Sequence, residues 1–360
     1  MNGATVLSDT RTMPALVLHD VGDLRLEEVP VPEISAGQAL VRVHACGVCG
    51  SDIPRIYHKG TYRFPTICGH EFAGTIQAVA RDVSSLQPGD PVAVFPLLWC
   101  GQCAACERGQ FVQCCNYGYL GSRSNGGFAR FVSAPARNLL KVPPTVSLDD
   151  AAMTEPAAVA LHALRRVKRC FAGETVAIFG AGPIGLMTAM WAGILGAGRI
   201  ILFDLMAPKL ELARTLGFTE VFNSREHDPV SVVNELTHGA GAHLTIDAAG
   251  VPATLLHAMG AVRCGGTVIV LGNPAGDVTI PAPLLSQLMR REVSVVGTWN
   301  SDYSVAGNDD DWRTVLAAMA AKQLNLSLLI THRVKLDQAI ATLNAMRSGS
   351  MFFSKVLFYT

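Results

Sequence analysis

The sequence predicts an α/β protein, in which an antiparallel, barrel-like β domain precedes a parallel sheet covered by helices on both faces. Up to about residue 155, short β-type runs are separated by glycine and proline turns. After Pro156, strand-like and helix-like segments alternate at the spacing of βαβ units. The composition agrees, because 49% of the residues are hydrophobic and 16% are charged, against about 25% charged in average domains. Strands buried on both faces produce such an excess of apolar residues.

The strand and helix predictions follow from local patterns. In the first domain, apolar and β-branched residues between turns predict strands. The clearest of these runs are 14–20, 24–29, 39–45, 73–80, 91–95 and 129–134. In the second domain, six Val- and Ile-rich runs predict parallel strands at 175–179, 199–203, 220–223, 243–247, 267–272 and 293–297. Helical spacing of apolar residues predicts helices at 184–196, 207–216, 252–260, 312–321 and 336–347.

A final strand-like run, 353–359, follows a complete six-strand set. We therefore expect the last part of the chain to return to the first domain. The expected division is 1–156, with a cysteine-rich loop at 99–115, then 157–297, and then 298–360 as the returning segment. Residues 1–12 are polar and are expected to form a loose extension.

The charge balance excludes several classes of protein. Lys plus Arg and Asp plus Glu are both 29, so the formal net charge is zero. A nucleic-acid binder would show a basic excess, and a disordered chain would be more charged and less apolar. The uncharged stretch 175–198 is long enough to cross a bilayer, but glycine and proline at 180–183 divide it into strand, turn and helix. We expect neither nucleic acid nor membrane as a partner. The first residues lack the apolar core of a signal peptide, so a cytoplasmic location is expected.

A glycine-rich turn predicts a dinucleotide site. Residues 180–185 read GAGPIG between a predicted strand and a predicted helix, which fits G-x-G-x-x-G. Gly180 would make the tight turn, Gly182 would let a pyrophosphate approach, and Gly185 would let the helix pack closely. Asp204 ends the next strand, where its carboxylate would bind the adenosine ribose and select NAD over NADP. The alternative is a glycine turn of another α/β fold with Asp204 as a helix cap. Further cofactor contacts are expected from Pro183, Ile184, Lys209, Leu271 and Gly272.

A cysteine cluster predicts a structural metal. Four cysteines form C-x2-C-x2-C-x7-C, namely Cys100, Cys103, Cys106 and Cys114. Four thiolates at this spacing can enclose one tetrahedral zinc ion without an open position. An iron–sulfur cluster is the other metal option, although the spacing differs from the bacterial ferredoxin pattern. Buried free thiols are the alternative without metal. Cys115, beside Cys114, leaves the ligand register open at that end.

A second group of residues suggests a catalytic metal. Cys49 and His70 lie in the segments CGSD and GHE, and Glu155 lies at the predicted domain junction. One cysteine, one histidine and one or two glutamates form a three-ligand zinc set with room for water or substrate. Each residue alone also fits a structural role, and the nearby dinucleotide motif favours the metal.

With these motifs in place, the sequence resembles the zinc-containing medium-chain alcohol and polyol dehydrogenases. GVCGSD, GHEFAG, the cysteine loop, EPAAVALHA and GAGPIG occur in this family's order, over essentially residues 14–360. The resemblance implies a GroES-like β-barrel catalytic domain, a central Rossmann domain, a cleft between them and a homodimer or homotetramer. It also implies NAD and two zinc ions per chain as cofactors. Within the family, CGSDIPRI and YLGSRSNGGFA look most like members that oxidise hexitols or hexitol phosphates such as galactitol 1-phosphate.

The resemblance also implies roles for single residues. Cys49, His70 and Glu155 would hold the catalytic zinc, and Glu71 would be an alternating ligand or a neighbour of the ligands. The four loop cysteines would hold the structural zinc. These ligands imply oxidation of a secondary alcohol to a ketone, with the hydride passing to the nicotinamide.

Proton handling departs from the common family pattern. Ser51 is placed to accept the hydroxyl proton, and Asp52 would orient His70 through its second ring nitrogen. Many relatives have a histidine in the proton relay five residues after the zinc-binding cysteine, where this chain has Pro54. The outward relay would then run through water or the ribose hydroxyl.

The substrate is a polyol by resemblance, either free or phosphorylated. A substrate phosphate needs cationic side chains, and Arg55 and Arg123 are the candidates. The family member that acts on galactitol 1-phosphate has a second arginine at the position where this chain has Ser124. This difference weakens the interpretation that the substrate carries a phosphate. Two other classes remain as alternatives: a zinc-free quinone reductase of the same fold, and a non-catalytic protein that uses its zinc loop to bind partners.

Overall fold

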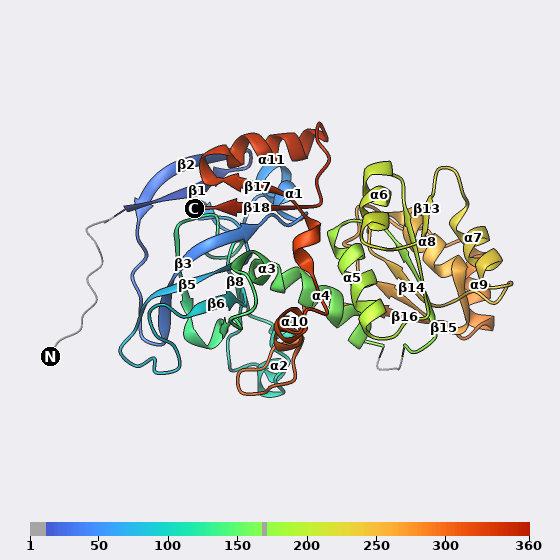
Figure 1. Ribbon diagram of the computed structural model, residues 1–360, viewed down its shortest axis with the longest axis horizontal. Helices are drawn as coiled ribbons and strands as arrows, with labels where there is room; N and C mark the ends of the chain where they lie inside the picture. Colours follow the sequence, from blue (N-terminus) through green and yellow to red (C-terminus); the bar gives the residue numbers. More distant parts are fainter. Residues whose placement is uncertain (1–11, 168–170) are drawn as a thin grey trace. The chain divides into compact units, whose positions relative to one another are not determined.

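The computed structural model describes residues 12–167 and 171–360, which form two compact units (Figure 1). The first unit consists of Met1–Glu155, Tyr303–Asp309 and Ile330–Thr360, and the second of Pro156–Asp302 and Asp310–Leu329. Of the expected N-terminal extension, residues 1–11 lie outside the described part, and Thr12 already belongs to the first strand.

The first unit is built from β-sheets. A three-stranded antiparallel sheet has the order β2-β1-β4, formed by β1 (Thr12–Asp20), β2 (Asp23–Pro30) and β4 (Thr66–Ile67). A seven-stranded sheet has the order β10-β6-β5-β3-β18-β17, and β9 also pairs with β3. Its strands are β3 (Gln38–Gly47), β5 (Glu71–Val79), β6 (Pro91–Val94), β9 (Phe131–Pro135), β10 (Leu139–Lys141), β17 (Ile330–Lys335) and β18 (Lys355–Tyr359). A small pair, β7 (Leu97–Leu98) and β8 (Gly118–Tyr119), flanks the cysteine-rich loop.

The last strand closes this sheet against an early one. β18 pairs antiparallel with β3, with Leu357 opposite Gly47, and parallel with β17. In Figure 1 the red C-terminal strands accordingly lie beside the blue β3. The expected return of the chain end therefore takes place through β17 and β18.

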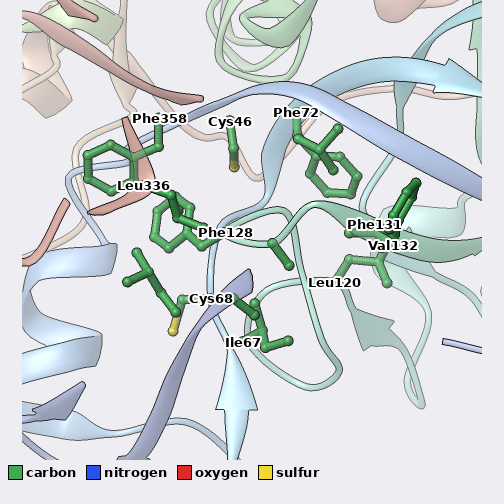
Figure 2. Packing of buried hydrophobic residues seen from close by; sticks show 14 of the residues in the cluster. Cys46, Ile67, Cys68, Phe72, Leu120, Phe128, Phe131, Val132, Leu336 and Phe358 are labelled. Atoms are coloured by element: carbon green, nitrogen blue, oxygen red, sulfur yellow. The ribbon is translucent and has the colours of Figure 1, made fainter. Parts of the chain in front are cut away.

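The core of the first unit lies between its sheets. Figure 2 shows Phe128 and Phe358 among the buried side chains, and their ring centroids are 5.0 Å apart. Cys46 and Phe72 lie in the same cluster. Burying side chains of this size contributes about 1.5–3 kcal/mol each, so this core holds both strands that carry the cysteine and histidine segments.

Short helices complete the first unit. They are α1 (Asp52–Pro54), η1 (Arg55–Lys59), α2 (Ala104–Glu107), η2 (Phe111–Gln113), η3 (Ala136–Asn138), α3 (Leu148–Ala152), η5 (Leu336–Gln338) and α11 (Ala339–Ser348). The Ser147 hydroxyl caps α3 by accepting a hydrogen bond from the Asp150 amide. α4 (Thr154–Arg165) begins in the first unit and continues in the second.

The second unit contains a six-stranded parallel sheet with the order β13-β12-β11-β14-β15-β16. Its strands are β11 (Thr175–Phe179), β12 (Arg199–Asp204), β13 (Glu220–Asn223), β14 (Ala242–Asp247), β15 (Val262–Val270) and β16 (Ser294–Gly297). Every residue of β11 is buried, as expected for a strand covered on both faces. The order reverses between β11 and β14, where open α/β sheets bind ligands.

Helices connect and flank these strands. They are α5 (Pro183–Ile194), α6 (Ala207–Thr215), α7 (Pro229–Leu236), α8 (Pro252–Ala261), α9 (Ala282–Arg290), α10 (Asp311–Ala320) and η4 (Leu326–Leu329). The uncharged stretch 175–198 contains β11, a turn and α5. Within the described residues, no helix is both long and apolar enough to cross a membrane.

Two segments differ from the expected division. Residues 298–302 and 310–329 belong to the second unit, although the sequence places them in the returning segment. A polar contact connects α10 to α4 of this unit: the buried Asp311 carboxylate of α10 lies 2.8 Å from Nδ1 of His162 and 3.1 Å from Nη1 of Arg165. An amphipathic pattern shows that α10 packs on a core, but it does not show which core.

Candidate active site and metal centres

The glycine-rich turn lies between β11 and α5 of the second unit. Gly180 has a φ of +113°, and a Cβ atom there would lie 2.9 Å from the Ala249 backbone nitrogen. At Gly185, a Cβ atom would lie 1.9 Å from the Gly180 carbonyl oxygen. At Gly182, no described atom lies within 4 Å of such a position. Gly180 and Gly185 are therefore needed for packing, whereas Gly182 leaves open space in front of the N-terminus of α5.

Asp204 ends β12 beside this turn. Its Oδ2 accepts a hydrogen bond from the Ala181 amide at 2.9 Å and lies 3.5 Å from the Lys209 ammonium. Its Oδ1 accepts bonds from the Leu205 and Met206 amides at 2.8 and 3.0 Å. The carboxylate is thus held at the carboxyl end of the sheet, next to the turn.

Sequence reasoning missed Asp247, which organises the other half of this edge. The residue is buried at the end of β14, and its backbone oxygen accepts hydrogen bonds from the amides of Leu271 and Gly272. Its carboxylate accepts bonds from the Gly250 amide at 3.0 Å and the Thr254 hydroxyl at 2.8 Å. An acidic residue at the end of an apolar strand was the available signal.

The four loop cysteines lie together in the first unit. The sulfur atoms of Cys100, Cys103, Cys106 and Cys114 are within 4.8 Å of one another. Backbone hydrogen bonds at Cys106 and Cys115 lower the pKa of the Cys103 thiol to about 5. Cys115 is exposed and is not one of the four. The donor set is that of a closed tetrahedral zinc site.

A second group of donors brings together Cys49, His70 and Glu71, whose ligand atoms also lie within 4.8 Å of one another. Gly69, with a φ of +89°, turns the chain just before His70. A thiolate, an imidazole and a carboxylate suit zinc, and three protein ligands leave a position open.

Asp52 supports this group through several contacts. Its Oδ1 lies 3.5 Å from Nδ1 of His70, which leaves the other ring nitrogen on the side of Cys49. Its Oδ2 accepts a hydrogen bond from the Cys49 amide at 3.0 Å, and Arg55 pairs with Oδ1 at 2.6 Å. Burial opposes ionisation, but the mutual attraction outweighs it, so the pKa of Asp52 is lowered and the pKa of His70 is raised well above its usual value.

Ser51 and Pro54 lie on the same segment. The Ser51 hydroxyl is exposed and donates to the Cys49 sulfur at 3.3 Å. Pro54 is the last residue of α1, and its ring offers no group that carries a proton.

Glu155 lies near the group but is held by a different residue. The Tyr119 hydroxyl, which sequence reasoning missed, donates to Glu155 Oε1 at 3.0 Å. The Tyr119 ring also contacts His70 edge-on at 5.7 Å. Burial raises the pKa of Glu155 to about 6, although His70 opposes this rise. Of the three expected ligands, the structure thus groups Cys49 and His70 with Glu71, and it places Glu155 beside Tyr119.

Lys355 is the other residue that the sequence did not single out. It lies in β18, is 2% exposed, and its ammonium is 2.6 Å from Glu71 Oε2. A lysine within the apolar run FSKVLFY was the available signal. Buried lysines are rare and need an anionic partner.

The two candidate phosphate-binding arginines have different surroundings. Arg55 is paired with Asp52. The Arg123 guanidinium lies 4.0 Å from the ring centroid of Tyr62 and 4.3 Å from that of Tyr117. Among the described residues, it pairs with no carboxylate. Tyr117 contacts Tyr119 edge-on at 6.5 Å, so ring contacts connect Arg123 with the donor group.

Comparison with known proteins agrees with this geometry. Residues 35–144 match the alcohol dehydrogenase GroES-like domain, and residues 183–321 match the zinc-binding dehydrogenase domain. Galactitol 1-phosphate 5-dehydrogenase of Escherichia coli K12 is 34% identical over 89% of this chain and 92% of its own. Sorbitol dehydrogenase of Bacillus subtilis is also 34% identical, over 80% of this chain and 82% of its own.

A solved structure extends the likeness to the fold. The crystal structure of galactitol-1-phosphate dehydrogenase from Escherichia coli superposes with a TM-score of 0.90 at 32% identity, covering 97% of this chain and all of the other. The predicted combination of a GroES-like β domain with a Rossmann sheet is thereby confirmed. The chain belongs to the zinc-containing medium-chain alcohol and polyol dehydrogenases, a family of oxidoreductases.

Proposed function

We propose that this protein oxidises a secondary hydroxyl group of an acyclic hexitol, or of its phosphate, to the ketone with NAD as the hydride acceptor. The family supports the reaction class, and the side chains of the two candidate sites support the assignment of roles. NAD bound at the glycine turn would accept the hydride from the carbinol carbon, and the chain's own residues would carry away the hydroxyl proton.

NAD rather than NADP is supported by Asp204. Its carboxylate is fixed beside the glycine turn by the amides of Ala181, Leu205 and Met206. At this position a carboxylate accepts hydrogen bonds from the ribose hydroxyls and repels a 2′-phosphate. Lys209 is bound to Asp204 and so does not present an uncompensated positive charge to such a phosphate.

Cys49 and His70, with one of two nearby carboxylates, would hold the catalytic zinc. Zinc bound there acidifies a hydroxyl group and so favours loss of its proton. Asp52 orients the His70 ring, and the exposed Ser51 hydroxyl accepts the substrate proton and returns it to water. The four loop cysteines would hold a second, structural zinc.

A phosphorylated hexitol is favoured by one observation, the position of Arg123. Two tyrosine rings hold its guanidinium, and no described carboxylate neutralises it. A guanidinium fixed in this way can bind a phosphate through two parallel hydrogen bonds. Arg55 is excluded from this role by its pairing with Asp52. A free hexitol is the second candidate, because the neighbouring Ser124 supplies no second cation and donates to the Tyr119 carbonyl.

The test is NADH formation with galactitol 1-phosphate, galactitol, altritol, sorbitol and xylitol, in wild type and in Arg123→Met. A hydrogen bond to a charged group contributes about 1.5–3 kcal/mol. We therefore expect kcat/KM for galactitol 1-phosphate to fall by about 10- to 100-fold in the variant, and to fall much less for the free polyols.

Arg81→Met, which removes an exposed arginine elsewhere in the same unit, is the matched control. An equal loss with phosphorylated and free substrates would contradict the phosphate role of Arg123. Absence of activity on all five compounds would overturn the polyol assignment itself.

A homodimer is also part of the proposal. β16 lies at the edge of the six-stranded sheet, and the side chains of Val295 and Trp299 are 48% and 60% exposed there. An exposed apolar edge strand is a template for pairing with another chain.

A further inference from the structure

Besides Asp52, three buried charged side chains lie near Cys49 and His70: Glu71, Glu155 and Lys355. Both carboxylates could in principle join the zinc ligands, since Glu71 lies within 4.8 Å of the other donors and Glu155 is connected to them through Tyr119. The two glutamates differ in what holds them, and this difference decides which one is available to the metal.

Glu71 is held by a full positive charge and by the backbone around it. Lys355 lies 2.6 Å from Oε2 and also donates to the Val48 carbonyl at 3.4 Å. A Cβ atom at Gly47 would lie 2.2 Å from the same Oε2, so the carboxylate occupies space that only glycine leaves. Because Gly47 pairs with Leu357 of β18, the strand that carries the lysine also fixes the carboxylate's position.

Glu155 is held by a neutral group. Its Oε1 accepts a hydrogen bond from the Tyr119 hydroxyl at 3.0 Å. This bond orients the carboxylate without neutralising it, so its negative charge remains available for a cation.

The charges then balance in two separate sets. A divalent zinc with one thiolate and one carboxylate is neutral, and a buried lysine with one carboxylate is also neutral. Moving the second carboxylate to the metal would leave the metal set negative and would deprive the buried Lys355 of its ion-pair partner, which is unfavourable.

We propose that Lys355 is a positioning residue of the zinc site, which holds the Glu71 carboxylate out of the metal's coordination. Glu155, the third ligand that the family resemblance implies, would then complete the set with Cys49 and His70. The inference rests on the proposed zinc site but not on the identity of the substrate.

The experiment uses the full chain loaded with cobalt(II), whose visible absorption reports ligand number and type. The spectrum of Cys49→Ser is subtracted to remove the contribution of the four-cysteine site. Glu71→Gln is expected to leave the difference spectrum unchanged and to weaken zinc binding less than about 3-fold, whereas Glu155→Gln changes the spectrum and weakens zinc binding by at least about 10-fold.

The lysine itself is tested by three variants. In Lys355→Met, Glu71 is released to the metal, and we expect the difference spectrum to lose intensity as the coordination number rises. Lys355→Met/Glu71→Gln is expected to restore the wild-type spectrum, and Lys355→Arg to preserve it. The double variant also serves as a folding control. It removes both buried charges together, so it leaves no unpaired charge that could unfold the protein.

Two outcomes would overturn the proposal: a spectral change in Glu71→Gln as large as that in Glu155→Gln, or a wild-type spectrum in folded Lys355→Met. Failure of the zinc site itself would look different, because Cys49→Ser would then have the same cobalt spectrum as wild type.

Discussion

Asp52 shows how one side chain can serve several groups of a site. It is fully buried, yet it contacts the Cys49 amide, the His70 ring and the Arg55 guanidinium. Arg55 compensates the negative charge of Asp52. The His70 nitrogen that faces Asp52 is Nδ1, and the other ring nitrogen faces Cys49. If His70 binds zinc as we propose, Asp52 would fix both the orientation of its ring and its basicity as a ligand.

We predict that Asp52→Asn weakens zinc binding at the catalytic site by about 10- to 100-fold, the usual effect of losing a partner of a metal-bound histidine. The amide keeps the shape but not the charge that stabilises the ring's orientation. Competition with a chromophoric chelator measures the affinity. Asp149→Asn, in the same unit but paired with His44 and Arg333, is the control and should bind zinc as wild type does. Unchanged affinity in Asp52→Asn would show that the contact with His70 is not needed.

The type of a single residue predicts its role when its chemistry is unusual. It does not predict which distant residues the fold will bring next to it. Cysteine and histidine in glycine-rich segments indicate metal ligands from the sequence alone. Lys355 could not be predicted, because 284 residues separate it from Glu71 and only the pairing of β18 with β3 brings them together. Tyr119 was missed because an isolated tyrosine forms no sequence motif that would indicate a role in the site.

At the scale of elements, the turn between β11 and α5 is determined by close approach of the backbone. A methyl group at Gly185 would overlap the Gly180 carbonyl oxygen. Gly193, in the same helix, has Ile200 Cδ1 as its nearest neighbour at 3.7 Å, which is ordinary contact. The two glycines thus provide a matched pair of substitutions.

We predict that Gly185→Ala lowers the free energy of unfolding by about 1–3 kcal/mol, as overpacking does, and weakens NADH binding by displacing the turn. Gly193→Ala is expected to be neutral or to stabilise by up to about 1 kcal/mol, since glycine is unfavourable inside a helix. Urea unfolding and NADH fluorescence titration measure the two effects. Equal behaviour of the two variants would contradict the requirement for glycine at position 185.

Most elements could be predicted because their signals are local. The six parallel strands and the glycine turn follow from apolar runs and from the glycine and proline residues between them. All six strands occur at or near their expected positions. The sequence places residues 310–329 in the returning segment, whereas they belong to the second unit, since the contacts of Asp311 with His162 and Arg165 depend on tertiary structure.

At the scale of the whole molecule, the surface of the second unit carries an exposed apolar edge. Leu285 and Met289 of α9 are exposed, as are Val295 and Trp299 in and after β16. Exposed apolar side chains on an edge strand favour pairing with a second chain. The zero net charge of the chain adds little repulsion between two copies.

We predict that the wild-type protein is a dimer and that Val295→Lys shifts it toward monomer, because a charge at the paired edge would be buried without a partner. Sedimentation velocity measures the distribution. Leu328→Lys is the control, since Leu328 is also exposed but belongs to η4 and not to the edge strand. A monomeric wild type, or a Val295→Lys variant with an unchanged sedimentation coefficient, would contradict the prediction.

The pairing of β18 with β3 also has a consequence for how the chain acquires its structure during synthesis. The six-stranded sheet is complete by Gly297, whereas the core around Phe128 lacks Phe358 until the last strand has been made. Contacts between residues this far apart in sequence close late, because a long loop must first be ordered. The six-stranded sheet can therefore form first on the ribosome, while Ala45, Cys46 and Gly47 of β3 still lack their partners in β18. Lys355 reaches Glu71 only when β18 pairs with β3, so the buried ion pair beside Cys49 and His70 forms only after the last strand has been made.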